Sequence, residues 1–89
     1  MISHIRGTIL HLDLKYVVIE THGIGYKVSV TPETITNLTH HNGKEVTLWT
    51  YLVIRDDAHT LYGFGSREEL DHFEILISVS GIGPKTELG

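Results

Sequence analysis

Apolar and polar residues alternate along much of the first two thirds of the chain, and this alternation is the pattern of half-buried β-strands. The clearest case is the stretch 26–31, in which Tyr26, Val28 and Val30 fall on one face. The pattern predicts five strands, which cover residues 2–12, 15–21, 26–31, 46–54 and 58–64. A short helix beginning at Thr31-Pro32-Glu33 follows the third strand, because proline is favoured in the first turn of a helix.

Glycine and aspartate mark the connections and the irregular points of these strands. Asp13-Leu14 suits the first turn. His22-Gly23-Ile24-Gly25 predicts a tight second connection, because its two glycines tolerate positive φ angles. Gly7 lies inside the first strand, where a glycine favours a bulge or a sharp bend. In the second strand, the continuous apolar run Tyr16–Ile19 is typical of a strand that is buried on both faces.

Five meandering strands with a glycine-bent first strand favour a small closed barrel of the OB type. An open sheet of five strands would expose the unpaired backbone groups of its edges, and closure removes those edges. We therefore predict a mainly β fold in which residues 1–64 form an OB-fold domain.

The longest predicted hairpin covers residues 46–64 and has a charged tip, Arg55-Asp56-Asp57. Its two flanks are rich in β-branched and aromatic residues, which suit a pleated, half-buried surface. Two neighbouring carboxylates repel each other and rarely help a fold. One interpretation is a solvated turn. The other is a tip that repels a negatively charged partner.

A helix is predicted after the hairpin. Ser66-Arg67-Glu68-Glu69 matches a capping box at its start. Helically spaced apolar residues carry it to about Val79, and they are Leu70, Phe73, Leu76 and Ile77. Gly81-Ile82-Gly83 ends this helix, and Pro84 suits the first position of another. Because a one-turn helix is unstable alone, residues 65–89 are expected to be the start of a second, helical domain that is cut at its C-terminal end.

The run Gly81–Thr86 is the first candidate for binding chemistry. Its two glycines let backbone N–H groups approach a ligand closely, and the helix that follows adds a positive dipole. These features favour a grip on one phosphate. The expected contacts are Gly81, Ile82, Gly83, Lys85 and Thr86, with Lys85 as a mobile cation. The alternative is a plain C-cap, because glycine ends many helices.

The composition limits the partners that we expect. The formal net charge is −4, from seven Lys and Arg against eleven Asp and Glu, and this balance alone argues against nucleic-acid binding. A DNA-binding function must therefore rest on local geometry. The chain has no cysteine, which excludes disulfides and fits a reducing cytoplasm. Its apolar runs are too short for a membrane helix, which needs about 20 residues.

No catalytic or metal site is predicted. The seven histidines show no metal-binding spacing, and the side chains of His40 and His41 are expected to diverge. Neither a nucleotide-binding loop nor a Cys-His pair is present, so we expect no catalysis and no cofactor. Aromatic rings on the long hairpin are able to stack bases, but their interleaving with Leu, Val and Ile favours a core role. These rings belong to Trp49, Tyr51, Tyr62 and Phe64.

Four stretches, in one order and spacing, resemble the N-terminal part of the RuvA family, the Holliday-junction-binding subunits of bacterial branch-migration machines. They are Ile5-Arg6-Gly7, Gly23-Ile24-Gly25-Tyr26-Lys27-Val28, Arg55–His59 with Leu61–Phe64, and Leu76–Thr86. The resemblance covers all 89 residues. Four matches of this kind form a specific signal.

The resemblance implies an OB-fold domain followed by a domain of two helix-hairpin-helix motifs, the first hairpin being Gly81–Lys85. It implies a flat homotetramer that holds a four-way DNA junction open for the hexameric ATPase motor RuvB, with the resolvase RuvC as a further partner. The acidic pin of the family falls on Asp56 and Asp57, next to Arg55. Such a subunit has no catalysis of its own and acts in the cytoplasm in recombination, DNA repair and the SOS response.

Some residues depart from the family pattern. Ser3-His4 stands where a glycine and a basic residue are usual, so the positive charge expected at this point is weaker. Glu87 stands where a small apolar residue is usual, which is unfavourable for the packing of the second helix against its partner. The alternative interpretation of the whole chain is a small OB-type module that binds protein or single-stranded nucleic acid, with only a helix C-cap at Gly81.

Overall fold

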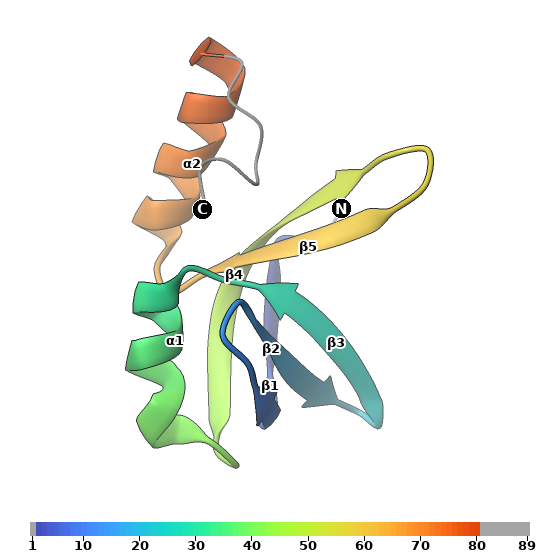
Figure 1. Cartoon of the computed structure of the whole chain (residues 1–89), viewed down its shortest axis with the longest axis vertical. Coiled ribbons are helices and arrows are strands. Elements are labelled where there is room, and N and C mark those ends of the chain that lie inside the picture. The colour runs from blue at the N-terminus through green and yellow to red at the C-terminus, as the bar shows by residue number, and fades with distance from the viewer. Residues whose placement is uncertain (1, 81–89) are drawn as a thin grey trace.

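The computed structural model describes residues 2–80, in which a closed five-stranded barrel carries two α-helices (Figure 1). The strands are β1 (His4–Leu12), β2 (Tyr16–Thr21), β3 (Ile24–Ser29), β4 (Glu45–Ile54) and β5 (His59–Phe64). Their order around the barrel is β1-β2-β3-β5-β4. Neighbouring strands are antiparallel, apart from β3 and β5, which run parallel. The predicted mainly β fold with a closed, OB-type barrel is confirmed.

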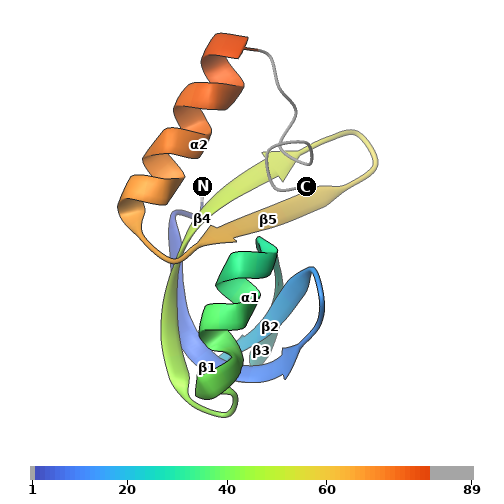
Figure 2. The same ribbon diagram turned by 60° about the vertical axis from the view of Figure 1, so that its left-hand side comes forward.

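The first helix forms where the sequence predicts it. α1 (Pro32–Leu38) has proline in its first turn, and the Thr31 hydroxyl accepts a 3.1 Å hydrogen bond from the Thr34 amide. That bond satisfies one of the free N–H groups at the start of the helix. Ile35 and Leu38 pack against the barrel core, so α1 lies along the barrel, away from the tip of the β4–β5 hairpin (Figure 2). A single 3₁₀ turn, η1 (Thr39–His41), follows it.

The barrel core is built from alternate residues of each strand. On β2, Val17 and Ile19 are fully buried, whereas Tyr16 and Val18 are only half-buried. The prediction that this run is buried on both faces is therefore wrong. A closed barrel has one interior, and no second layer of described residues covers the outer face of β2 completely. The continuous apolar run of β2 misleads because its outward-facing members are also apolar.

Gly7 permits close contact between strands instead of making a bulge. It pairs in regular register with Val46 on β4, and the irregularity of β1 lies between Ile9 and His11. A Cβ atom on Gly7 would collide with the carbonyl oxygen of Glu20, and would lie 2.8 Å from Ile19 Cγ2. Of the bulge or sharp bend predicted at Gly7, the bulge lies three residues further along the strand. The glycine is needed because β2 passes directly over it.

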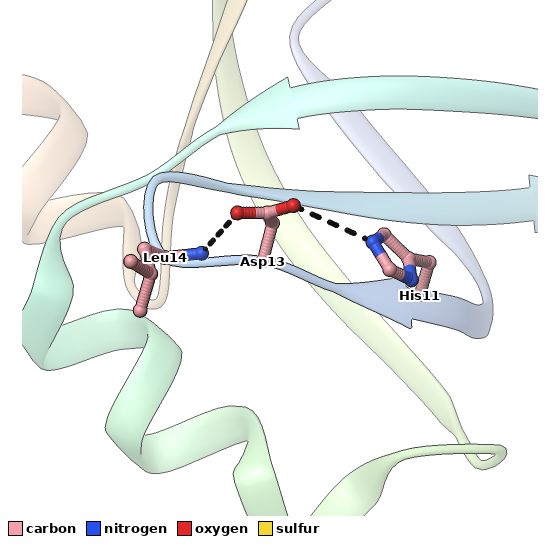
Figure 3. A network of polar contacts seen from close by, with 3 residues as sticks. All are labelled: His11, Asp13 and Leu14. Atoms are coloured by element: carbon pink, nitrogen blue, oxygen red, sulfur yellow. Dashed lines mark hydrogen bonds and ion pairs between the residues drawn. The ribbon is translucent and has the colours of Figure 1, made fainter.

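The turn between β1 and β2 is held by Asp13, as the sequence indicates. The Leu14 amide donates a 2.7 Å hydrogen bond to one carboxylate oxygen of Asp13, and His11 Nε2 lies 3.5 Å from the other (Figure 3). The Leu14 hydrogen bond is the main reason that the pKa of the Asp13 carboxyl lies below its ordinary value. The Asp13 charge in turn raises the pKa of the Tyr16 hydroxyl. These exposed contacts shape a turn.

The connection between β2 and β3 is tighter than the four residues predicted. His22 and Gly23 both have positive φ angles, 53° and 84°, so they form the two-residue turn of a hairpin. Ile24 and Gly25 already belong to β3, and Gly25 pairs with Glu20. The expected freedom of two glycines is therefore used only at Gly23, and a histidine takes the other left-handed position.

Candidate nucleic-acid interface

The β4–β5 hairpin extends beyond the rest of the barrel (Figure 1). β1 pairs with β4 only from Glu45 to Trp49, whereas β4 and β5 remain paired as far as Ile54 and His59. The last residues of the hairpin therefore form a two-stranded ribbon. The residues from Ile54 to His59 are exposed to solvent. This ribbon carries Asp56 and Asp57 away from the barrel surface.

The hairpin tip (Arg55–Ala58) is a short, regular turn. The Arg55 amide donates a 2.8 Å hydrogen bond to the Ala58 carbonyl, and the Ala58 amide donates one of 3.4 Å in return. Positive φ angles in the described part of the chain occur only at His22, Gly23 and Gly43. The tip is therefore formed without left-handed residues, and other polar side chains are able to replace Asp56 and Asp57 without backbone strain.

Both carboxylates of the tip face solvent. Within residues 2–80, neither Asp56 nor Asp57 forms an ion pair, and both residues are exposed. Arg55 is adjacent in sequence and is exposed as well. The tip thus presents two unneutralised negative charges at the most prominent point of the hairpin, an arrangement that repels other anions over a distance of about 8 Å at physiological salt.

Helix α2 (Arg67–Ser80) begins at the base of this hairpin, as the capping box predicts. The Ser66 hydroxyl accepts a 3.2 Å hydrogen bond from the Glu69 amide. Glu68 and Glu69 lie in the first turn, where negative charge complements the helix dipole. The predicted phosphate-binding residues Gly81, Ile82, Gly83, Lys85 and Thr86, together with Glu87, lie outside the described residues. Their roles therefore stay predictions.

The aromatic residues of the hairpin pack against α2. They form a second core, separate from that of the barrel, which we call the aromatic cluster. Its buried members are Tyr62, Phe64, Leu70 and Phe73, and its partly buried members are Trp49, Tyr51, Val53 and Ile77. The predicted core role of Trp49, Tyr51, Tyr62 and Phe64 is confirmed. Because helix α2 covers this face of the hairpin, the face is not an open platform for stacking bases.

A cation–aromatic contact at the start of α2 was not predicted from the sequence. The Arg67 guanidinium lies 5.7 Å from the centroid of the Trp49 ring, and the His4 ring lies 5.7 Å from it, tilted by 44°. His4 and Trp49 are paired across β1 and β4. The strand register that brings His4 next to Trp49 is a tertiary feature, which the sequence does not reveal. The local signal in this region is the capping box, and it places Arg67 only in the first turn of a helix.

Among residues 2–80, no three His, Cys, Asp or Glu side chains gather in a way that could hold a metal ion. In the same range, no helix combines the length and the apolar character required to cross a bilayer.

The chain is similar in sequence to one known protein family. The family model described as "RuvA N terminal domain" matches residues 1–63. Proteins named "Holliday junction branch migration complex subunit RuvA" match over nearly the whole chain. The relative from Chlamydia trachomatis serovar L2 is 47% identical over 88 residues, covering 99% of this chain and 44% of the relative.

Two further relatives with the same name have similar identities. That of Clavibacter sepedonicus is 48% identical over 99% of this chain and 40% of its own length. That of Mycolicibacterium gilvum is 46% identical over 100% of this chain and 45% of its own length. The chain thus spans less than half the length of the curated relatives that it matches. The barrel, the projecting hairpin and the match over residues 1–63 together show that this chain belongs to the RuvA N-terminal domain family.

Proposed function

We propose that this chain is part of a non-catalytic DNA-binding subunit that holds a four-way junction open during branch migration. The observation that carries the proposal is the exposed pair Asp56 and Asp57 at the end of a projecting hairpin, in a chain of the RuvA family. Two adjacent, unpaired carboxylates repel each other within a turn, so they do not help this fold through their charge. Two negative charges at one point repel a phosphate more strongly than one does.

The physical basis of the proposal is a contrast between two charges. In a homotetramer with four-fold symmetry, four copies of the two acids place eight carboxylates around one axis. These carboxylates repel DNA strands at the centre. Backbone amides and Lys85 attract phosphates of the four duplex arms at the periphery. A negative centre with attractive surroundings favours a DNA whose strands part in the middle, which is a junction.

The phosphate grip is proposed for Gly81, Ile82, Gly83, Lys85 and Thr86, at the first of two helix-hairpin-helix motifs. In this proposal residues 1–64 are the OB-fold domain, and residues 65–89 begin the helix-hairpin-helix domain. The partners are the motor RuvB, which supplies ATP hydrolysis, and the resolvase RuvC. The subunit acts in the cytoplasm, and the processes that it serves are DNA recombination, DNA repair and the SOS response. No cofactor is required, because binding and strand separation are electrostatic.

A direct binding measurement tests the proposal against its rival, a module for single strands or protein. The full-length protein should bind a four-way junction more tightly than a duplex or a single strand of equal nucleotide number, at one fixed salt concentration. A preference for the single strand would favour the rival. The packing of the aromatic rings of the hairpin against α2 supports the junction function, because Tyr62 and Phe64 are buried and Trp49 and Tyr51 are partly covered.

Replacing Lys85 by alanine should weaken binding to every DNA sequence about equally. One lost phosphate contact should reduce the slope of log affinity against log salt by roughly one unit. The measurement is a salt titration of junction binding by the full-length wild type and variant. Lys44→Ala, in the loop that enters β4, is the control for the loss of one positive charge. A loss that depends on base sequence would contradict the phosphate role.

A further inference from the structure

We infer that Phe73 is a positioning residue that fixes the direction of α2 relative to the hairpin tip. The inference rests on the proposed function, in which Asp56 and Asp57 act at the centre of the junction and the residues after α2 hold its arms. Phe73 belongs to neither group of residues that the proposed function places against DNA. It sets the separation between them.

The hairpin is the shared wall of two cores. On β5, Leu61 packs in the barrel core, while Tyr62 and Phe64 pack on the opposite side of the strand, in the aromatic cluster. On β4, Leu48 belongs to the barrel core, and Tyr51 packs in the cluster. The two strands that project the tip are therefore the same two strands on which α2 is seated. Movement of α2 relative to the tip has to disrupt the aromatic cluster.

Phe73 is the central residue of this cluster. It is 1% exposed, and three rings of the hairpin surround it. Its ring centroid lies 4.8 Å from that of Phe64, 5.9 Å from Tyr62 and 5.7 Å from Tyr51, the last in an edge-on arrangement at 72°. Tyr51 and Tyr62 are paired across β4 and β5. Phe73 therefore contacts both strands at once, and ring geometry is a directional constraint.

A second contact keeps α2 from pivoting about Phe73. Six residues earlier on the helix, the Arg67 guanidinium lies over Trp49 of β4. Between Arg67 and Phe73, Leu70 is 6% exposed. Ile77 continues the same helix face and packs against the cluster. Contacts spaced along one face of α2 define its axis as well as its position.

This seating has a consequence for the segment that follows the helix. Phe73 lies seven residues before Ser80, the last residue of α2. At 1.5 Å per residue, the helix extends about 10 Å beyond Phe73. Both views show α2 and the hairpin leaving the barrel from a common base and diverging from there (Figures 1 and 2). A tilt of α2 on a loosened cluster would therefore displace its end and alter the distance between the repelling tip and the residues after α2 that are proposed to hold the duplex arms.

The test compares two buried large-to-small substitutions, one in each core. Phe73→Ala empties the aromatic cluster, and Ile19→Ala, at a fully buried site on β2, empties the barrel core. Amide hydrogen exchange of α2, with the barrel strands as reference, and the junction-to-duplex affinity ratio are measured in the full-length protein. If either alanine variant fails to fold, Phe73→Leu and Ile19→Val replace the pair.

We expect Phe73→Ala to speed exchange in α2 selectively and to lower the junction-to-duplex ratio by at least about tenfold, because acids that are no longer held at a fixed distance from the phosphate grip also repel the strands of a junction. Ile19→Ala should leave the ratio unchanged at a comparable loss of thermal stability. In the milder pair, Phe73→Leu should lower the ratio in the same direction but by less, and Ile19→Val should leave it unchanged. Three results would overturn the inference. The first is an unchanged ratio in Phe73→Ala despite fast α2 exchange, and the second is α2 exchange as slow as in the wild type. The third is an equal fall of the ratio in both alanine variants. A wild type without junction preference would overturn the proposed function itself, and the inference with it.

Discussion

Replacing Gly7 by alanine should destabilise the barrel by about 3 kcal/mol, near the upper end of the usual cost of overpacking. The added methyl group would meet the carbonyl group of Glu20, whose carbon atom would lie 2.9 Å away, and Ile19 Cγ2 at 2.8 Å. A side chain can change rotamer, but the backbone of β2 is held by its pairing with both β1 and β3. Relief therefore requires separation of two strands in the closed barrel.

Equilibrium unfolding in urea measures this loss, and the fluorescence of Trp49, the single tryptophan of the chain, follows the transition. Gly65→Ala is the matched control, because a Cβ there would meet only Glu69 Oε1 at an ordinary 3.7 Å. The control should change the free energy of unfolding little. A Gly7→Ala loss no larger than that of the control would show that β1 and β2 do not approach each other as described.

The strands and helices could be predicted because their signals are local. Alternation of apolar residues marks β3, Pro32 marks the start of α1, and the capping box at Ser66 marks the start of α2. The errors share a different cause. Glycine is needed at position 7 because a carbonyl group of another strand lies close to it. His22 has a positive φ angle because the pairing of β2 with β3 leaves only two residues for the turn between them. Neither can be deduced from neighbouring residues.

The candidate site divides in the same way. The exposed tip at Asp56 and Asp57 follows from two charges between two apolar strands, so the sequence predicts it. The apolar spacing of α2 predicts that Phe73 is buried, but it does not identify Tyr51, Tyr62 and Phe64 as the partners. Those contacts depend on the return of the chain across the hairpin after Gly65.

Converting both tip acids to amides, Asp56→Asn with Asp57→Asn, should raise duplex affinity far more than junction affinity. Like charges brought together at an interface cost several kcal/mol, so relief of even about 1.4 kcal/mol at a duplex raises its affinity by roughly tenfold. A junction whose strands already part at the centre gains less. The fold should persist, because the tip uses no left-handed backbone and amides form turns as readily as carboxylates.

The change in net charge needs its own control. Glu33→Gln with Glu45→Gln removes the same two charges from exposed positions on α1 and at the start of β4, away from the hairpin tip. Non-specific attraction of DNA should rise equally in both double variants. Any additional change in DNA affinity in the Asp56 and Asp57 variant is therefore caused by the location of these two acids at the tip.

The most direct test of the junction function is the ratio of junction affinity to duplex affinity in full-length wild type and the two double variants, at one fixed salt concentration. We predict that the ratio falls by about tenfold when Asp56 and Asp57 are neutralised, and that it changes little when Glu33 and Glu45 are. An unchanged ratio in the Asp56 and Asp57 variant, with fold and assembly intact, would mean that the tip is only a solvated turn and would contradict the proposed function.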